Sequence, residues 1–175
     1  MDLLDRLLGH DAWTTRALLH RCAALDDAAL DRPFEFGRRT LRITLAHIIR
    51  NMEVWSDLMA GGAVRPDAGI APAGRNVAGL TARLDVAAAD LARVARGVAR
   101  RGAWDELWLD TLDDPPRRKT YGGAIAHVLT HSMHHRAQVI MMLRALGVAD
   151  VPEGDVLSWE QQHAAGAADR AEGSK

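Results

Sequence analysis

Apolar residues recur at intervals of three and four in four long segments of the chain, the spacing that gives an α-helix one buried face. The clearest segment begins after Asn76, which can cap a helix, and ends at Gly102, which can terminate one. A seam of this spacing predicts a helix that packs against others in a bundle. The seam consists of Val77, Leu80, Leu84, Ala87, Leu91, Val94 and Val98.

Three further helices follow from the same spacing. One is expected after the capping residue Thr40 and ends near Ala60, and another covers about residues 122–146. The first in chain order covers residues 2–24, and its apolar face consists of Leu4, Leu7, Leu8, Leu18, Leu19 and Cys22. Four amphipathic helices of this length predict an all-α protein, a four-helix bundle.

The segments between the helices are rich in turn residues. Residues 103–120 hold one alternating stretch, Glu-Leu-Trp-Leu-Asp-Thr-Leu, followed by an Asp-Asp-Pro-Pro turn and by Arg-Arg-Lys-Thr, which can return beside it. This order predicts a small hairpin across one end of the bundle. Residues 25–39 and 61–75 are expected to be loops. A short terminal helix is expected from Ser158 to about Ala165.

The overall composition is that of a globular protein, with 175 residues, 48% apolar and 26% charged. A net charge of −1 gives no support for nucleic acid or an anionic membrane as a partner. No apolar run approaches ~18 residues and the N-terminus lacks a basic segment, so neither a transmembrane helix nor a signal peptide is predicted. The single cysteine, Cys22, fits a reducing compartment. We expect one cytoplasmic domain over residues 1–165 and a disordered tail at 166–175.

The most informative polar residues are His131 and His135 in the last predicted helix. They are four residues apart, so both imidazoles project from one side of the helix and can share a metal ion. They lie on the apolar side of the helix, since they share a stripe with Ala124, Val128, Val139, Met142 and Leu146. Buried imidazoles need partners, because an unsatisfied buried polar group costs roughly 1–3 kcal/mol. A shared metal ion would satisfy both.

A third ligand must come from another helix, and His47 is the best candidate. It lies on the inward face of its predicted helix with Ile43, Asn51, Val54 and Leu58. The remaining histidines fit less well. His127 is turned about 80° away from His135, His134 flanks the stripe, His10 and His20 lie off the apolar face of the first helix, and His163 is near the end of the chain. The alternative is a set of histidines that hydrogen-bond one another without metal.

Other polar residues can support such a site. Metal-bound histidines usually donate their second N–H to an oxygen. The candidate acceptors are Asp11, Glu53, Asp57 and Gln138. Asp11 has a second interpretation, as a hydrogen-bonded residue at a helix–helix seam. Arg136 is expected either on the rim, where it can bind an anionic substrate or a partner subunit, or in solvent.

These motifs resemble the DinB-like (damage-inducible, YfiT-type) metalloenzymes over most of the chain. The resemblance lies in Asp11-Ala12-Trp13, in Leu45-Ala46-His47-Ile48 with Glu53 and Trp55, in His127-Val128-Leu129-Thr130-His131, and in His134-His135-Arg136-Ala137-Gln138. Ala137 stands where that family usually has glycine. The resemblance implies an up-down-down-up four-helix bundle, commonly a homodimer, with a divalent metal at His47, His131 and His135.

Three imidazoles leave a divalent ion with an open coordination position, as in catalytic zinc sites. Zinc suits these ligands best, and imidazole also accepts nickel, copper or iron. The resemblance suggests a transferase that uses a low-molecular-weight thiol on a small-molecule substrate, or a metal-dependent hydrolase. Cys22 is expected to pack rather than react, which favours a nucleophile from solution. The alternative of another class is a non-catalytic, stress-associated metal-binding bundle.

Overall fold

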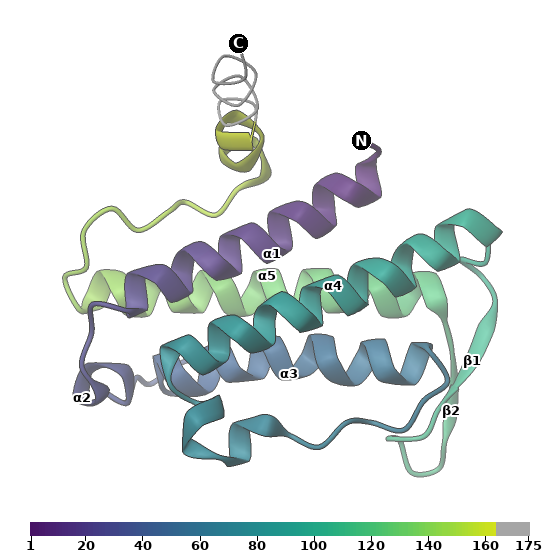
Figure 1. Ribbon diagram of the computed structural model, residues 1–175, viewed down its shortest axis with the longest axis horizontal. Coiled ribbons are helices and arrows are strands. Elements are labelled where there is room, and N and C mark those ends of the chain that lie inside the picture. Colours follow the sequence, from purple (N-terminus) through teal and green to yellow (C-terminus); the bar gives the residue numbers. More distant parts are fainter. Residues whose placement is uncertain (164–175) are drawn as a thin grey trace.

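The computed structural model describes residues 1–163, and four long helices make up most of it (Figure 1). Both α1 and α3 pack against α4 and α5, so each long helix has two principal neighbours. The helices are α1 (Leu3–Cys22), α3 (Leu41–Met59), α4 (Val77–Arg101) and α5 (Tyr121–Ala145). A mostly helical fold built from four long helices is therefore confirmed, and each predicted helix is found within a few residues of its expected bounds.

The four helices begin at side chains that cap their free N–H groups. The Thr40 hydroxyl accepts a hydrogen bond from the Ile43 N–H at the start of α3, and the Asn76 side chain accepts one from Gly79 at the start of α4. Asp2 and Thr120 cap α1 and α5 in the same way. Both caps predicted from the sequence are confirmed.

The core lies between the four helices and is mainly aliphatic. The predicted seam of α4 faces it: five of its seven positions are buried, and Val77 and Val94 are half-buried. Gly102 ends the helix with a φ of 65°, a conformation that costs glycine little. On α1 the predicted apolar face is right for Leu8, Leu18, Leu19 and Cys22 and wrong for Leu7, which is 39% exposed.

The hairpin predicted between the last two helices is present, with β1 (Leu107–Asp110) antiparallel to β2 (Arg117–Thr120). The Trp108 side chain is buried on its inner face and packs edge-on against Trp55 of α3, with ring centroids 5.9 Å apart. On the neighbouring strand, Lys119 pairs with the buried Asp110. These contacts fix the hairpin at the end of α3 and the start of α5.

Short helices occupy the two segments expected to be loops. Residues 25–39 contain α2 (Asp27–Leu30), and residues 61–75 contain the 3₁₀ turns η1 (Ala68–Ile70) and η2 (Pro72–Gly74). Elements of three or four residues are too short to show a helical period, which is why the sequence pattern misses them.

The C-terminal part returns to the first helix (Figure 1). Residues 156–163 are helical, starting slightly earlier than expected. Glu160 forms a 2.6 Å ion pair with Arg6, and Trp159 packs on Gly9. The predicted tail, residues 166–175, and the end of the terminal helix lie outside the described residues. Within residues 1–163, none of the helices combines the length and the apolar character needed to cross a membrane.

Candidate metal centre

The three histidines singled out in the sequence come together between α3 and α5. His47 of α3 faces His131 and His135 of α5, and the ring centroids are 4.5 to 5.1 Å apart. One ring nitrogen from each residue lies within 4.8 Å of the others, a group that could hold a metal ion. The pair from α5 is close because its members are one helical turn apart, whereas His47 is brought to them by the packing of α3 on α5.

Gln138 determines which nitrogen of His135 faces the other two. The Nδ1 of His135 lies 2.7 Å from the Gln138 Oε1, so Nδ1–H donates to this oxygen and Nε2 is left for the centre. The amide of Gln138 in turn donates to the His134 Nε2 at 2.9 Å. Gly37 packs against Gln138 with a φ of 65°, and a Cβ there would come within 2.9 Å of the same Oε1. Glycine at this position therefore leaves room for the orienting amide.

The surroundings favour neutral imidazoles. Burial lowers the pKa of His47 to about 4, and the positive charge of Arg38 adds to this effect. Burial also lowers the pKa of His131 and of His135, although the hydrogen bond to Gln138 partly opposes the shift at His135. Neutral imidazole is the form that binds metal ions, so the lowered pKa values fit a ligand role.

The spacing of the nitrogens fits a metal ion after a small adjustment. The Nε2 atoms of His47 and His131 are 2.9 Å apart, a hydrogen-bond distance. Two imidazole nitrogens bound to one tetrahedral zinc ion lie about 3.3 Å apart, given Zn–N bonds of ~2.0–2.1 Å. An opening of a few tenths of an ångström would bring this pair to that separation, and the His135 nitrogen lies within 4.8 Å of both.

Comparison with known proteins identifies the family of this chain. The DinB family model matches residues 1–164 of the chain. This protein belongs to the DinB family. No curated protein matches the chain at a significant level.

The other histidines of this DinB protein lie outside the group of three. The His127 ring stacks on His131 with centroids 5.1 Å apart, and His134 is exposed beside Gln138. His20 and His163 are exposed. His10, which the sequence places off the apolar face of α1, is buried, and its Nε2 lies 2.7 Å from the carbonyl oxygen of Gly154.

Among the four candidate acceptors, the structure supports only Gln138. Glu53 accepts hydrogen bonds from Arg50 and Arg83, and Asp57 accepts them from Arg65. Neither carboxylate bonds a histidine within the described residues, so both predictions were wrong. Arg83 and Arg65 were missed as partners because ion pairs between different segments leave no periodic signal in the sequence.

Asp11 and Arg136 form a buried ion pair between α1 and α5. The interpretation of Asp11 as a seam residue is therefore confirmed, and its alternative role as an acceptor for the metal site is wrong. Both expectations for Arg136 were wrong, since its side chain is on neither the rim nor the solvated surface. Burial raises the pKa of the Asp11 carboxyl, and the Arg136 guanidinium opposes that rise.

A wide cavity adjoins the three-histidine group on the side of His47. Its volume is about 990 Å³, and Arg38 and Ile43 are among the residues that line it. Arg38 forms no ion pair in the part of the chain that the structure describes, and it was missed because it lies in a loop without a motif. Cys22 is buried, and burial raises the pKa of its thiol to about 12, as expected for a packing residue.

Proposed function

We propose that this DinB-family protein is a metal-dependent thiol S-transferase. In this proposal, His47, His131 and His135 hold one divalent ion, most suitably zinc, with nickel or iron as alternatives. The reaction joins a low-molecular-weight thiol to a small electrophile. The observation that carries the proposal is the group of three neutral imidazoles beside a cavity of about 990 Å³.

The chain offers no reactive thiol of its own for such chemistry. Its single cysteine is buried and its thiol pKa is about 12, so Cys22 is protonated at neutral pH. A thiol from solution would supply the nucleophile instead. A divalent ion at the three histidines would supply the positive charge that favours the deprotonated thiol.

The residues around the site have separate tasks in this proposal. Gln138 keeps the Nε2 of His135 directed at the centre, and Arg38 provides a positive charge on the wall of the wide cavity. In the reaction, the thiol proton goes to solvent, a sulfur–carbon bond forms, and the leaving group departs with the electron pair of the broken bond.

Several further properties belong to the same proposal. We infer an up-down-down-up bundle, one domain over residues 1–165, a cytoplasmic location and a homodimer.

Support for the homodimer comes from α5: between Tyr121 and Leu143 its one charged residue, Arg136, is buried. Five of its exposed positions form a seam with spacings of four, three, four and four, made of Ala126, Thr130, Met133, Ala137 and Met141. A surface helix without exposed charge suits contact with a second copy.

The test uses protein purified without a nickel column, with its metal content measured. Conjugation of 1-chloro-2,4-dinitrobenzene and of iodoacetamide is followed with cysteine, glutathione and coenzyme A as thiols. We expect a rate above background with at least one pair, abolished by a chelator, restored by zinc, and retained in Cys22→Ser. A rate unaffected by chelation contradicts metal dependence. Bound metal without conjugation would favour the non-catalytic protein, and metal-dependent cleavage of an ester such as 4-nitrophenyl acetate would favour the hydrolase.

A further inference from the structure

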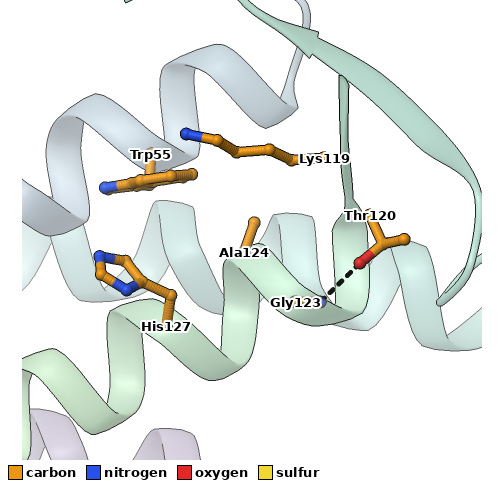
Figure 2. Close-up of a pocket in the computed structure, with 6 residues that line it drawn as sticks. All are labelled: Trp55, Lys119, Thr120, Gly123, Ala124 and His127. Atoms are coloured by element: carbon orange, nitrogen blue, oxygen red, sulfur yellow. Dashed lines mark hydrogen bonds between the residues drawn. The ribbon is translucent and has the colours of Figure 1, made fainter. Parts of the chain in front are cut away.

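A second, smaller cavity of about 430 Å³ lies between the hairpin and the ends of α3 and α5 (Figure 2). Trp55 contributes an indole wall from α3, and His127 contributes an imidazole wall from α5. Ala124 and Gly123 form a wall of small residues on α5, and Lys119 and Thr120 of β2 complete the lining. The cavity therefore has two aromatic rings and no bulky side chain from α5 apart from His127.

We call this second, smaller cavity the hairpin pocket. The charges around it disfavour an ionic ligand. The Lys119 ammonium pairs with Asp110 and lies 3.2 Å from a carboxylate oxygen of Asp113, so the three groups together carry one negative charge. An anion would meet that excess of negative charge. A cation would compete with Lys119, whose Nζ already lies 4.9 Å from the centre of the Trp55 ring. Both ions would also lose hydration on entering, whereas a neutral group would lose little.

The pocket lining offers a ligand two aromatic rings, those of Trp55 and His127. Trp55 lies between Lys119 and His127, as Figure 2 shows, with the Trp55 and His127 ring centroids 5.1 Å apart. Trp108 packs edge-on against Trp55 from the hairpin and fixes the indole in place. Aromatic rings prefer other rings in offset or edge-on contact, which adds about 0.5–1.5 kcal/mol per pair to the burial of apolar area.

A single side-chain ring, that of His127, separates the hairpin pocket from the candidate metal centre. His127 belongs to its lining and also stacks on His131, at an interplanar angle of 27°. Along α3, Trp55 lies two turns beyond His47, while the wide cavity extends from His47 toward the start of that helix. The three histidines thus lie between a wide, charged cavity and a small, apolar one.

We propose that the hairpin pocket binds the uncharged aromatic part of the electrophilic substrate, leaving the wide cavity to the polar thiol. Naming the ligand as the electrophile rests on the proposed transferase function. The existence of the aromatic site does not depend on the transferase function, because the site is built from residues outside the group of three histidines.

Binding is tested first with three unreactive probes of one shape: 2-naphthylmethanol, 2-naphthoate and 2-naphthylmethylamine. Calorimetric titration of metal-free and zinc-loaded protein should show the neutral alcohol bound at least about 10-fold more tightly than either ion, which corresponds to ~1.4 kcal/mol. Nuclear Overhauser contacts between naphthyl protons and the Trp55 indole should locate the alcohol. Absence of binding, or contacts elsewhere, overturns the proposal.

Two variants separate the pocket from the rest of the molecule. In Ala124→Leu the larger side chain fills the space, and the affinity for the alcohol should fall about 10-fold or more. The matched control is Ala145→Leu, the same change at an exposed position near the end of α5, which should bind like the wild type. Because Ala124 is buried, His127→Ala serves as the second variant: His127 is exposed, and its loss should also weaken binding. Unchanged affinity in both Ala124→Leu and His127→Ala would rule the pocket out.

Turnover then distinguishes this proposal from the transferase itself. Ala124→Leu should lower kcat/KM for N-(2-naphthyl)iodoacetamide, whose reacting carbon extends beyond its aromatic ring, about 10-fold and leave that for iodoacetamide itself within about two-fold. Equal losses for both electrophiles would contradict the assignment of the pocket to the aromatic substrate. Naphthyl binding without any thiol conjugation would instead leave the pocket standing and refute the transferase function.

Discussion

At the scale of single residues, the centre depends on three imidazoles and on the amide that orients one of them. His47 and His131 face each other through their Nε2 atoms, and the Gln138 amide directs the Nε2 of His135 toward them. Gly37 leaves the space that Gln138 needs. A change at any of these positions should therefore appear first in metal affinity.

We expect about one divalent ion per chain, and loss of stoichiometric metal in each of His47→Ala, His131→Ala and His135→Ala. The exposed His20 and His163 provide the controls, since their alanine variants should keep the ion. Gln138→Leu should weaken affinity by about 10- to 100-fold, the usual effect of losing a residue that orients a ligand. Metal analysis after dialysis measures all of these, and a His47→Ala protein with full metal content would refute this ligand set.

The lowered pKa values of the three histidines predict how the metal-free protein responds to acid. In the unfolded chain, His47 takes up its proton near pH 6.5, whereas in the folded protein it does so only near pH 4. The folded state thus binds fewer protons between these values, so its free energy of unfolding falls as the pH drops from about 6.5 toward 4. Urea unfolding at several pH values, with chelator present, checks this. His47→Asn should show a smaller loss, and an identical pH dependence in both proteins would contradict the prediction.

Much of the site can be predicted from the sequence, and the part that cannot has a physical reason. His131 and His135 are recognisable because two polar residues interrupt an apolar stripe, and Gln138 follows from its place one turn on. Arg38 could not be predicted, because it lies in a loop that has no periodic pattern. Lys119 reaches the hairpin pocket only because β2 pairs with β1, a contact that depends on tertiary structure.

At the scale of helices and strands, the buried Asp11–Arg136 pair ties α1 to α5 next to His135. Within the described residues, the two side chains are among the few charged ones that are almost wholly buried, at 3% exposure each. Arginine stays protonated in proteins, so loss of its partner leaves an uncompensated charge in the core.

We therefore expect Asp11→Asn to lower the free energy of unfolding by about 3–5 kcal/mol. The double variant Asp11→Leu/Arg136→Met should recover much of this loss, because it removes both charges and keeps apolar volume. Chemical denaturation of the three proteins provides the measurement. A loss below about 1 kcal/mol for Asp11→Asn, or a double variant less stable than the single one, would show that the pair contributes little to holding α1 on α5.

The long helices could be predicted from the sequence because their caps and apolar periods agree with the fold. Thr40, Asn76 and Gly102 mark helix ends that the structure shows at those positions. Leu7 was misassigned: it belongs to the apolar stripe of α1, yet 39% of it remains exposed while the neighbouring Leu8 is buried. The ion pairs of Asp11, Glu53 and Asp57 could not be predicted, since each joins residues from different segments.

At the scale of the whole molecule, the uncharged outer seam of α5 predicts the mode of assembly. A symmetric homodimer that packs the two α5 seams together would cover Met133 and Met141, each 56% exposed in the single chain. Met133→Glu should convert the dimer to a monomer, because two like charges would meet near the symmetry axis. Val86→Glu, at a similarly exposed apolar residue of α4, should leave the dimer intact. Sedimentation at micromolar concentration measures both, and a monomeric wild type would refute the homodimer.

The separation of His47 from His131 along the chain has a consequence for the stability of the protein. The two residues are 84 positions apart in the sequence, so an unfolded chain would have to close a long loop to bring both to one ion. A helical α5 alone can offer two imidazoles, but the third arrives only when α3 docks. An ion held by all three would act as a removable cross-link between two helices, adding about 2.7 kcal/mol to native stability when its free concentration is 100 times its Kd. The supply of metal would then control how long the protein resists heat and proteolysis.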